Sequence, residues 1–297
     1  MSVIPARPFS VITTCDISVS DYSYSSQSHL TLDNKSTTMD WSADGSRLYI
    51  GLKTDRYVRG WVAATPWSVT GLTLPTNYGY GFVPEINSGG SVWSTLVNTA
   101  PDGTAGGQML LNLAFGLSIC KIAQYTLPFP YDLRQGNPPG TGSPLYPTYT
   151  PVFIGSYDTT ADTAADAIND MRMSPDGTRL IAVGSTQASA ATLFQWNLTT
   201  PYDVLGGMTF QTPVVLSGYD FRSLYVPPSG ACLYLGSTGT INQFTMSAWE
   251  ISTLNTTPVD TLDVSSELPG VISSIYVTEN DLYALGTDNG DVYQYSR

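Results

Sequence analysis

The chain has 297 residues, of which only 12% are charged, while 27 glycines, 20 prolines and 19 tyrosines make it rich in turn-forming and aromatic residues. This composition is typical of short strands joined by turns, and it argues against long amphipathic helices, which need a charged outer face. The formal net charge of -12 argues against nucleic acid as a partner, because phosphate binding needs clustered Lys and Arg.

No stretch of the sequence is long and apolar enough to span a bilayer, and residues 1–10 lack the features of a signal peptide. We therefore expect synthesis in a cytoplasm without membrane insertion. Cys15, Cys120 and Cys232 are widely spaced and form no Cys-x-x-Cys pair. This pattern favours buried reduced thiols over disulfide bridges or a zinc site.

Internal repeats are the strongest signal in the sequence. Three segments align: MDWSADGSRLYIG from Met39, MRMSPDGTRLIAVG from Met171 and LYVPPSGACLYLG from Leu224. Each predicts an alternating strand, a tight turn and a second strand that ends at Gly. A fourth copy begins at Ile275, and a degraded fifth copy with a longer hairpin begins at Ser94.

A third strand with an aromatic residue near its end follows each hairpin. These strands begin at Arg56, Ser118, Thr192, Thr240 and Gly290. Short exit motifs, which contain proline, then occur at 65–69, 130–133, 200–204 and 257–260. Proline has no backbone donor, so it suits the entry to an outer edge strand. The repeat of about 50 residues predicts an all-β fold, a single five-bladed β-propeller of four-stranded antiparallel blades.

The last repeat stops after its third strand. At the other end of the chain, Cys15-Asp16-Ile17-Ser18 is similar to the exit motifs and continues into an alternating strand. We therefore predict that residues 10–33 add the outer strand to the blade of residues 271–297 and so close the ring. The stretches 75–90 and 129–151 match no repeat and are predicted insertions in the single domain 1–297.

The sequence of the third repeat carries a resemblance to a known family. Ser-Pro-Asp-Gly-Thr-Arg-Leu at 174–180, Gln-Trp-Asn-Leu at 195–198 and Thr-Thr-Pro-Tyr-Asp-Val at 199–204 resemble the β-propeller repeats of tailed-bacteriophage virion proteins. Such proteins occur in tail fibres and other surface components. The resemblance implies a virion location after synthesis in the cytoplasm of a bacterial host. It implies other virion proteins, or a host-surface glycan or protein, as partners, and it leaves open a homo-oligomer in the particle.

Motifs for enzyme or cofactor chemistry are mostly missing from the sequence. His29 is the only histidine and stands in an alternating strand segment, and no Gly-x-Ser-x-Gly, P-loop or Gly-x-Gly-x-x-Gly motif occurs. Residues 288–291, Asp-Asn-Gly-Asp, offer oxygen ligands for calcium but lack the distal Glu and match a hairpin turn. The Asp-Gly pairs at 44–45, 102–103 and 176–177 are likewise read as turns. We expect no cofactor and no metal site.

Three functional hypotheses remain. The leading one is a non-enzymatic virion propeller of the tail or a fibre that contacts the host surface or neighbouring subunits, and capsid decoration is the structural alternative. The enzymatic alternative is a glycosidase with a carboxylate pair in the central channel, for which Glu85 and Asp170 are the candidates.

The two insertions contain aromatic residues that suit stacking against a sugar or docking against a protein. The expected ligand- or partner-binding residues are Tyr78, Tyr80, Phe82, Tyr131, Tyr146 and Tyr149. The alternative is that these rings fold back over the blade edges.

Overall fold

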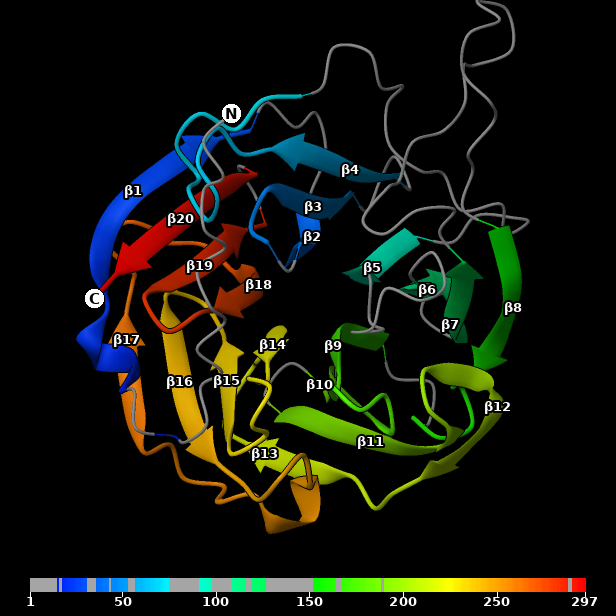
Figure 1. Ribbon diagram of the computed structural model, residues 1–297. Coiled ribbons are helices and arrows are strands. Elements are labelled where there is room, and N and C mark those ends of the chain that lie inside the picture. The colour runs from blue at the N-terminus through cyan, green and yellow to red at the C-terminus, as the bar shows by residue number, and fades with distance from the viewer. Residues whose placement is uncertain are drawn as a thin grey trace, which may run out of the picture.

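The computed structural model describes residues 15, 18–30, 36–42, 44–52, 57–74, 91–97, 108–115, 119–126, 152–163, 167–187, 190–287 and 290–297. Over these ranges the chain is all-β, and its antiparallel sheets stand around a common centre as the blades of a β-propeller (Figure 1). The helical segments in these ranges are the short 3₁₀ turns η1 (Val19–Asp21) and η2 (Ile251–Thr253). None of the described segments is a helix able to cross a membrane.

The described strands form five sheets, numbered I to V here in chain order. Sheet I contains β2 (Ser36–Trp41), β3 (Arg47–Leu52) and β4 (Tyr57–Val62). Sheet II contains β5 (Ser91–Val97), β6 (Gln108–Phe115), β7 (Ile119–Thr126) and β8 (Val152–Asp158). Sheet III contains β9 (Ala167–Met173), β10 (Arg179–Gln187), β11 (Ala190–Thr200), β12 (Asp203–Phe210) and β13 (Val214–Ser217). Sheet IV contains β14 (Ser223–Tyr225), β15 (Cys232–Gly236), β16 (Thr240–Thr245) and β17 (Asp260–Asp263). Sheet V contains β18 (Ile272–Val277), β19 (Asp281–Gly286), β20 (Asp291–Ser296) and β1 (Ser23–His29).

Sheet I differs from the predicted four-stranded blade. Sheets II to V have at least four strands each, whereas sheet I has three in the described ranges. After β4 the chain turns back, and Val62 and Thr73 exchange two backbone hydrogen bonds of 2.9 and 3.0 Å. A single bridge therefore stands where the outer strand would begin. The predicted insertions 75–90 and 129–151 lie outside the described residues.

The first strand of the chain pairs with the last. β1 runs antiparallel to β20 from Ser23 opposite Ser296 to His29 opposite Asp291, seen in Figure 1 as the blue and red strands side by side. His29 Nδ1 also forms an ion pair with Asp291 Oδ1 across this pair of strands. Residues more than two hundred positions apart in sequence thus share one sheet.

The inner strands β2, β5, β9, β14 and β18 lie nearest the centre (Figure 1). Each contacts the next in that order, and β18 contacts β2. Apolar side chains fill the spaces between neighbouring sheets. Phe221, Leu233 and Phe244, for example, belong to one buried cluster that sheets III and IV share. Burial between radial sheets, rather than within one central core, is what a propeller sequence of short alternating strands requires.

Two of the three predicted Asp-Gly turns have the predicted geometry, and the third, at 102–103, lies outside the described residues. In the β9–β10 turn Gly177 has φ +69°, and Asp176 Oδ1 accepts a hydrogen bond of 3.0 Å from the Thr178 backbone N–H. The turn at residues 44–45 repeats both features. Burial alone would raise the pKa of Asp176, but hydrogen bonds from Ser174 and Thr178 outweigh it and hold the pKa below its ordinary value.

An aromatic residue from the following connection covers each of three hairpin glycines. Tyr202, itself at φ +62°, donates its backbone N–H to the Gly177 carbonyl at 2.9 Å. A Cβ atom at Gly177 would lie 2.5 Å from the Tyr202 ring. The same arrangement recurs with Trp67 on Gly45 and with Trp249 on Gly230. Glycine is therefore needed both for its positive φ and for the space that the ring occupies.

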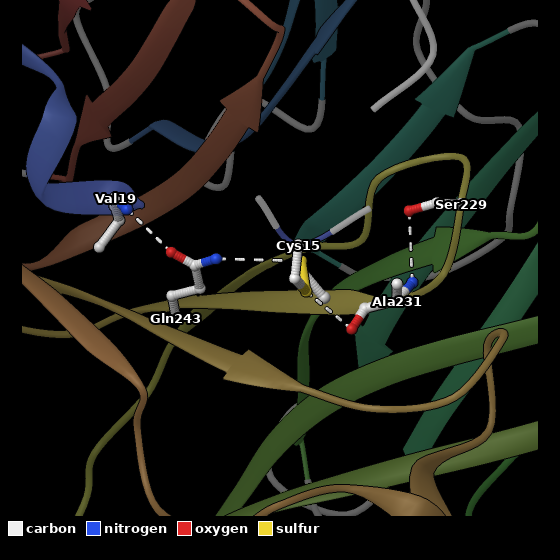
Figure 2. The surroundings of a disulfide bond; sticks show 6 residues. Cys15, Val19, Ser229, Ala231 and Gln243 are labelled. Carbon is white, nitrogen blue, oxygen red and sulfur yellow. Dashed lines mark hydrogen bonds between the residues drawn. A yellow bond between two sulfur atoms is a disulfide. The ribbon is translucent and has the colours of Figure 1, made fainter. Parts of the chain in front are cut away.

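A buried glutamine on the third strand of a sheet holds the connection of a neighbouring sheet. Gln195 of β11 accepts a 2.9 Å hydrogen bond from the Ile251 backbone N–H, which joins sheets III and IV. Gln243 of β16 accepts one of 2.8 Å from the Val19 N–H, just before β1 (Figure 2). The remaining two contacts of this type join Gln124 to Val204 at 3.0 Å and Gln294 to Val69 at 3.3 Å. These four glutamines are called the inter-sheet glutamines below.

These contacts do not all fall on the predicted exit motifs. In sheet IV the segment that is held by an inter-sheet glutamine is 249–251, and the predicted motif at 257–260 instead leads directly into β17. At the N-terminus the contact falls on Val19, one residue beyond the predicted Cys15–Ser18 motif. The proline motifs of sheets III and IV thus lead into the outer strands β12 and β17, as predicted. The segment that a glutamine of the neighbouring sheet holds has a different marker in sheets I, III and IV, an aromatic residue two positions before a β-branched one.

The expectation of reduced thiols is also wrong for two of the cysteines. Cys15 and Cys232 are joined by a disulfide, with their Cα atoms 5.6 Å apart. Cys120 is buried and takes no part in a disulfide. The spacing of 217 residues hid the pair, because only the meeting of the N-terminal segment with sheet IV brings the two residues together.

Replacing Gln195 by Leu keeps the volume but removes the acceptor for the buried Ile251 N–H. We expect a loss of about 1–3 kcal/mol in the free energy of unfolding, because that N–H is left without a partner. This loss is measured by urea denaturation, with tryptophan fluorescence as the signal of unfolding. Gln211→Leu is the control, since this half-exposed side chain only donates to the Thr209 carbonyl, and it should change stability by less than about 0.5 kcal/mol.

Gly177→Ala tests the packing of the aromatic residue on the hairpin. The matched control is Gly218→Ala, because Gly218 also has a positive φ of +88° but nothing within 4 Å of the added methyl group. Both variants incur the left-handed strain of about 1–2 kcal/mol, and only Gly177→Ala must also displace Tyr202. Thermal unfolding should therefore show the larger drop for Gly177→Ala. Equal drops would mean that the ring does not constrain the turn.

Candidate functional site at the polar centre of the ring

The aromatic residues predicted to bind a ligand or partner are not placed by the structure. Tyr78, Tyr80, Phe82, Tyr131, Tyr146 and Tyr149 all lie outside the described residues, as does Glu85. Asp170 is the one member of the predicted carboxylate pair whose surroundings are described. It lies at the centre of the molecule.

A layer of polar residues, one from each inner strand, surrounds this centre. We call it the polar belt, and its members are Thr38, Ser94, Asp170, Ser223 and Ser274. All five are buried. Three belt side chains accept a backbone N–H from the next sheet, in contacts from Thr95 to Thr38 at 3.2 Å, from Met171 to Ser94 at 3.1 Å and from Leu224 to Asp170 at 3.1 Å.

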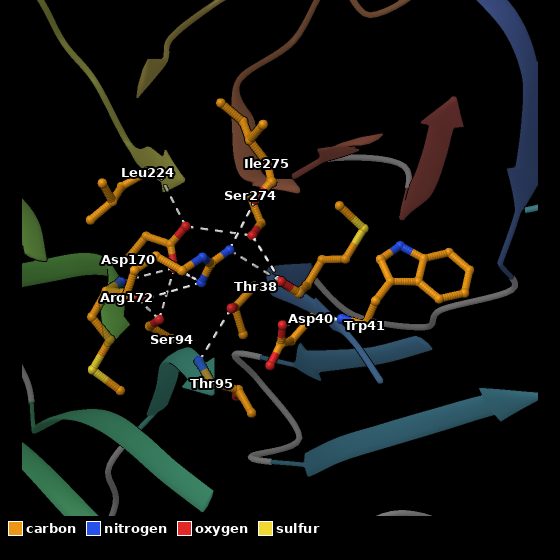
Figure 3. A network of polar contacts seen from close by, with 12 residues as sticks. Thr38, Asp40, Trp41, Ser94, Thr95, Asp170, Arg172, Leu224, Ser274 and Ile275 are labelled. Carbon is orange, nitrogen blue, oxygen red and sulfur yellow. Dashed lines mark hydrogen bonds and ion pairs between the residues drawn. The ribbon is translucent and has the colours of Figure 1, made fainter. Parts of the chain in front are cut away.

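The carboxylate of Asp170 is the most heavily bonded member of the belt (Figure 3). Its Oδ1 accepts hydrogen bonds from Ser94 Oγ at 2.8 Å and from the Met171 N–H at 2.9 Å. Its Oδ2 accepts one from the Leu224 N–H at 3.1 Å and a longer one from Ser274 Oγ at 3.5 Å. One side chain of sheet III therefore contacts the inner strands of sheets II, IV and V.

Arg172, two residues after Asp170 on β9, contacts the remaining inner strand, that of sheet I. Its Nη1 lies 3.2 Å from Asp170 Oδ1, and both side chains are almost fully buried. Its Nη2 donates to the Ile275 carbonyl at 2.9 Å and to the Met39 carbonyl at 3.4 Å. Through Met39 the guanidinium contacts sheet I, so the Asp170–Arg172 pair contacts the inner strands of all four other sheets (Figure 3).

Burial and ion pairing act in opposite directions on the pKa of Asp170. Burial raises the pKa of Asp170 above its ordinary value, while the Arg172 guanidinium and the hydrogen bonds from Leu224 and Ser94 oppose that rise. The Tyr225 ring lies beside the cation, with its centroid 5.8 Å from Arg172 Cζ. Burial also raises the pKa of the Tyr225 hydroxyl.

This arrangement is suited to holding strands together. A general acid or base must reach a substrate atom with a free oxygen, whereas both oxygens of Asp170 are engaged by the protein and the residue is 0% exposed. Of the two carboxyl groups in the hypothetical Glu85–Asp170 pair, that of Asp170 is therefore buried in the interior, and that of Glu85 lies outside the described residues. Asp170 lies in the middle of β9.

The other polar candidates of the sequence have structural partners. His29 is an ordinary residue of β1, as predicted, and pairs with Asp291. Gly290, in the predicted 288–291 turn, has φ +67°, as such a turn needs. The described part of the chain contains no group of three or more His, Cys, Asp or Glu residues that could hold a metal ion.

Sequence reasoning missed Arg172 and the inter-sheet glutamines. The signal for Arg172 is its position in an aligned repeat, where two other copies carry Tyr225 and Tyr276. A charged residue on a buried inner strand needs a buried partner. The glutamines stand directly before the aromatic residue of the third strand, as in Gln195-Trp196 and Gln243-Phe244.

Comparison with known proteins gives structural neighbours alone. No protein-family model and no curated protein sequence matches the chain. The β-propeller domain of Swd1 from Myceliophteria thermophila shares 11% identity at a TM-score of 0.44, over 88% of this chain and 83% of that one. Raptor from Chaetomium thermophilum shares 12% at 0.41, over 90% of this chain but only 19% of its own length. A 6-phosphogluconolactonase candidate from Bacteroides uniformis shares 15% at 0.41, over 77% of this chain and 55% of that one.

At these identities and TM-scores the similarities carry no argument about activity or partners. The chain is a β-propeller on the evidence of its strand pairing and of the radial arrangement of its sheets. None of the three neighbours is described as a virion protein.

Arg172→Met tests the role of the buried pair. The variant leaves the Asp170 carboxylate buried without its cation, and we expect a loss of about 3–5 kcal/mol in the free energy of unfolding, measured by urea denaturation at neutral pH. The control is Arg222→Met, which removes an exposed ion pair of 3.1 Å with Asp220 and should cost no more than about 1 kcal/mol. Similar losses in the two variants would contradict a special role for the centre.

Proposed function

We propose that the chain forms a five-bladed ring closed by β1, and that it serves as a non-enzymatic structural or attachment protein of a tailed-phage virion. The ring presents the insertions 75–90 and 129–151 to the host surface or to neighbouring virion subunits.

Two sets of contacts support the five-bladed, closed form. The inner strands contact one another in cyclic order from β2 to β18 and back to β2. The pairing of β1 with β20 supplies the outer strand of sheet V from the other end of the chain. Such pairing between the ends favours a ring because it offsets the entropy of bringing them together.

The observation that carries the non-enzymatic role is the use of the central carboxylate. Asp170, the one ionisable member of the polar belt, is ion-paired with Arg172 and holds strands of neighbouring sheets. A buried, fully bonded group of this kind contributes to the fold rather than to chemistry on a substrate. Function then falls to the surface, where connecting segments usually carry recognition.

The outer edge of sheet II supports a contact role for that side of the ring. Val152, Phe153 and Ile154 follow one another along β8 and have exposed fractions of 59%, 42% and 49%. Consecutive exposed apolar side chains on an edge strand are unusual for a surface that meets water alone. They follow directly on the 129–151 insertion in the sequence.

The test uses phage adsorption to its host. Bacterial cells are incubated with the purified chain before the phage is added. We expect adsorption to fall about tenfold once the chain occupies about 90% of the receptors, which needs a concentration of about ten times its Kd. The variant Tyr78→Ala/Tyr80→Ala/Tyr146→Ala/Tyr149→Ala should lose the block. The matched control Tyr24→Ala removes an exposed tyrosine of β1 and should keep it.

Two results would overturn the proposal. One is a pair of findings: the folded chain leaves phage adsorption unchanged, and mass spectrometry does not detect the chain in purified particles. The other is release of sugar from host-surface polysaccharide that Glu85→Gln abolishes while circular dichroism is unchanged, which would favour the glycosidase.

A further inference from the structure

We propose that Cys15 and Cys232 form a redox-controlled tether, a disulfide that opens in reducing surroundings and, when oxidised, fixes the N-terminal segment to sheet IV. This inference goes beyond the proposed function and does not depend on a virion location.

The position of the two cysteines sets the consequence of the bond. Cys232 begins β15 in sheet IV and is fully buried, whereas Cys15 precedes β1, the outer strand of sheet V. Their Cα atoms are 5.6 Å apart, within the span of about 4.4–6.8 Å that a disulfide accepts. The bond therefore joins sheet IV to the segment that leads into the outer strand of sheet V.

Non-covalent contacts seat the same segment without the disulfide (Figure 2). The Val19 N–H donates to Gln243 Oε1 at 2.8 Å, and the Ser20 N–H donates to Asp260 Oδ2 at 2.7 Å. The Ala231 carbonyl lies 2.8 Å from Cys15 Sγ and is in place to accept a hydrogen bond from the reduced thiol. The reduced chain thus keeps the two sulfur atoms close together, which prepares them for oxidation.

The chemistry of closing the tether is thiol–disulfide exchange with a small-molecule disulfide such as oxidised glutathione. Cys15, which is only partly buried, loses its proton to solvent and attacks one sulfur of the oxidant, releasing one thiolate and forming a mixed disulfide. Cys232 then loses its proton and attacks Cys15 Sγ, which releases the second thiolate. Two cysteine thiols are oxidised, one external disulfide is reduced to two thiols, and the two protons balance the released thiolates.

Oxidation would change the stability of ring closure more than the shape of the ring. The bond closes a loop of 217 residues, and a cross-link over so long a loop restricts the unfolded chain strongly. Thiols remain reduced in a cytosol and pair in oxidising surroundings. The tether would therefore be open during synthesis and closed after the protein reaches an oxidising compartment.

The experiment compares the full-length chain in oxidised glutathione and in dithiothreitol. We expect reduction to lower the Tm by about 5–10 °C and to speed hydrogen exchange of β1 (residues 23–29) at least about tenfold. Cys15→Ser and Cys232→Ser should each make Tm and exchange independent of the reductant. Cys120→Ser, which removes the buried cysteine outside the disulfide, should respond to reduction as the natural chain does.

Reduction of the natural chain tests the redox-controlled tether even if a cysteine variant fails to fold. An unchanged Tm together with unchanged β1 exchange would overturn the tether. Peptide mapping that finds both Cys15 and Cys232 alkylated after exposure to oxidised glutathione would also overturn it. A fall in Tm upon reduction that Cys15→Ser retains would assign the effect to another cysteine.

Discussion

The ion pair between Asp170 and Arg172 is the interaction on which the arrangement of the sheets depends most. Both residues stand on β9, yet their partners lie on the inner strands of sheets I, II, IV and V. A propeller has no single core, so its sheets need contacts near the axis to fix their relative positions. A buried ion pair gives such contacts directionality that apolar packing lacks, at a desolvation cost that the attraction between the two charges and their hydrogen bonds oppose.

The inter-sheet glutamines perform the matching role farther from the axis. Each accepts a backbone N–H that would otherwise be buried without a partner, and each lies between two sheets rather than within one. The contact between Gln243 and Val19 places the N-terminal segment in the same role that internal connections have elsewhere. The joint between the N-terminal segment and sheet IV therefore uses the same kind of contact as the joints between other sheets, with a disulfide beside it.

Much of the local structure could be predicted because it depends on neighbouring residues. The Asp176-Gly177 turn is an example, since the carboxylate and the positive φ act within the turn itself. The pairing of β1 with β20 was also predicted, from a strand missing at one end of the sequence and present at the other. The proline motif of sheet IV leads into the outer strand β17, as predicted, but it did not reveal the contact that joins sheets III and IV, because that contact uses the Ile251 N–H.

The sequence by itself determined the all-β class, the repeated hairpins and the partner of the first strand, because alternation and turn chemistry are properties of short stretches. Only the tertiary structure decided which polar residues meet. Asp170 is a catalytic candidate on the sequence alone, and its structural role became clear from Ser94 and Leu224 on neighbouring sheets, which no sequence spacing places around it. The pairing of Cys15 with Cys232 was hidden for the same reason. Such contacts form between sheets, and their geometry is set by how the sheets pack around the axis, which no single repeat encodes.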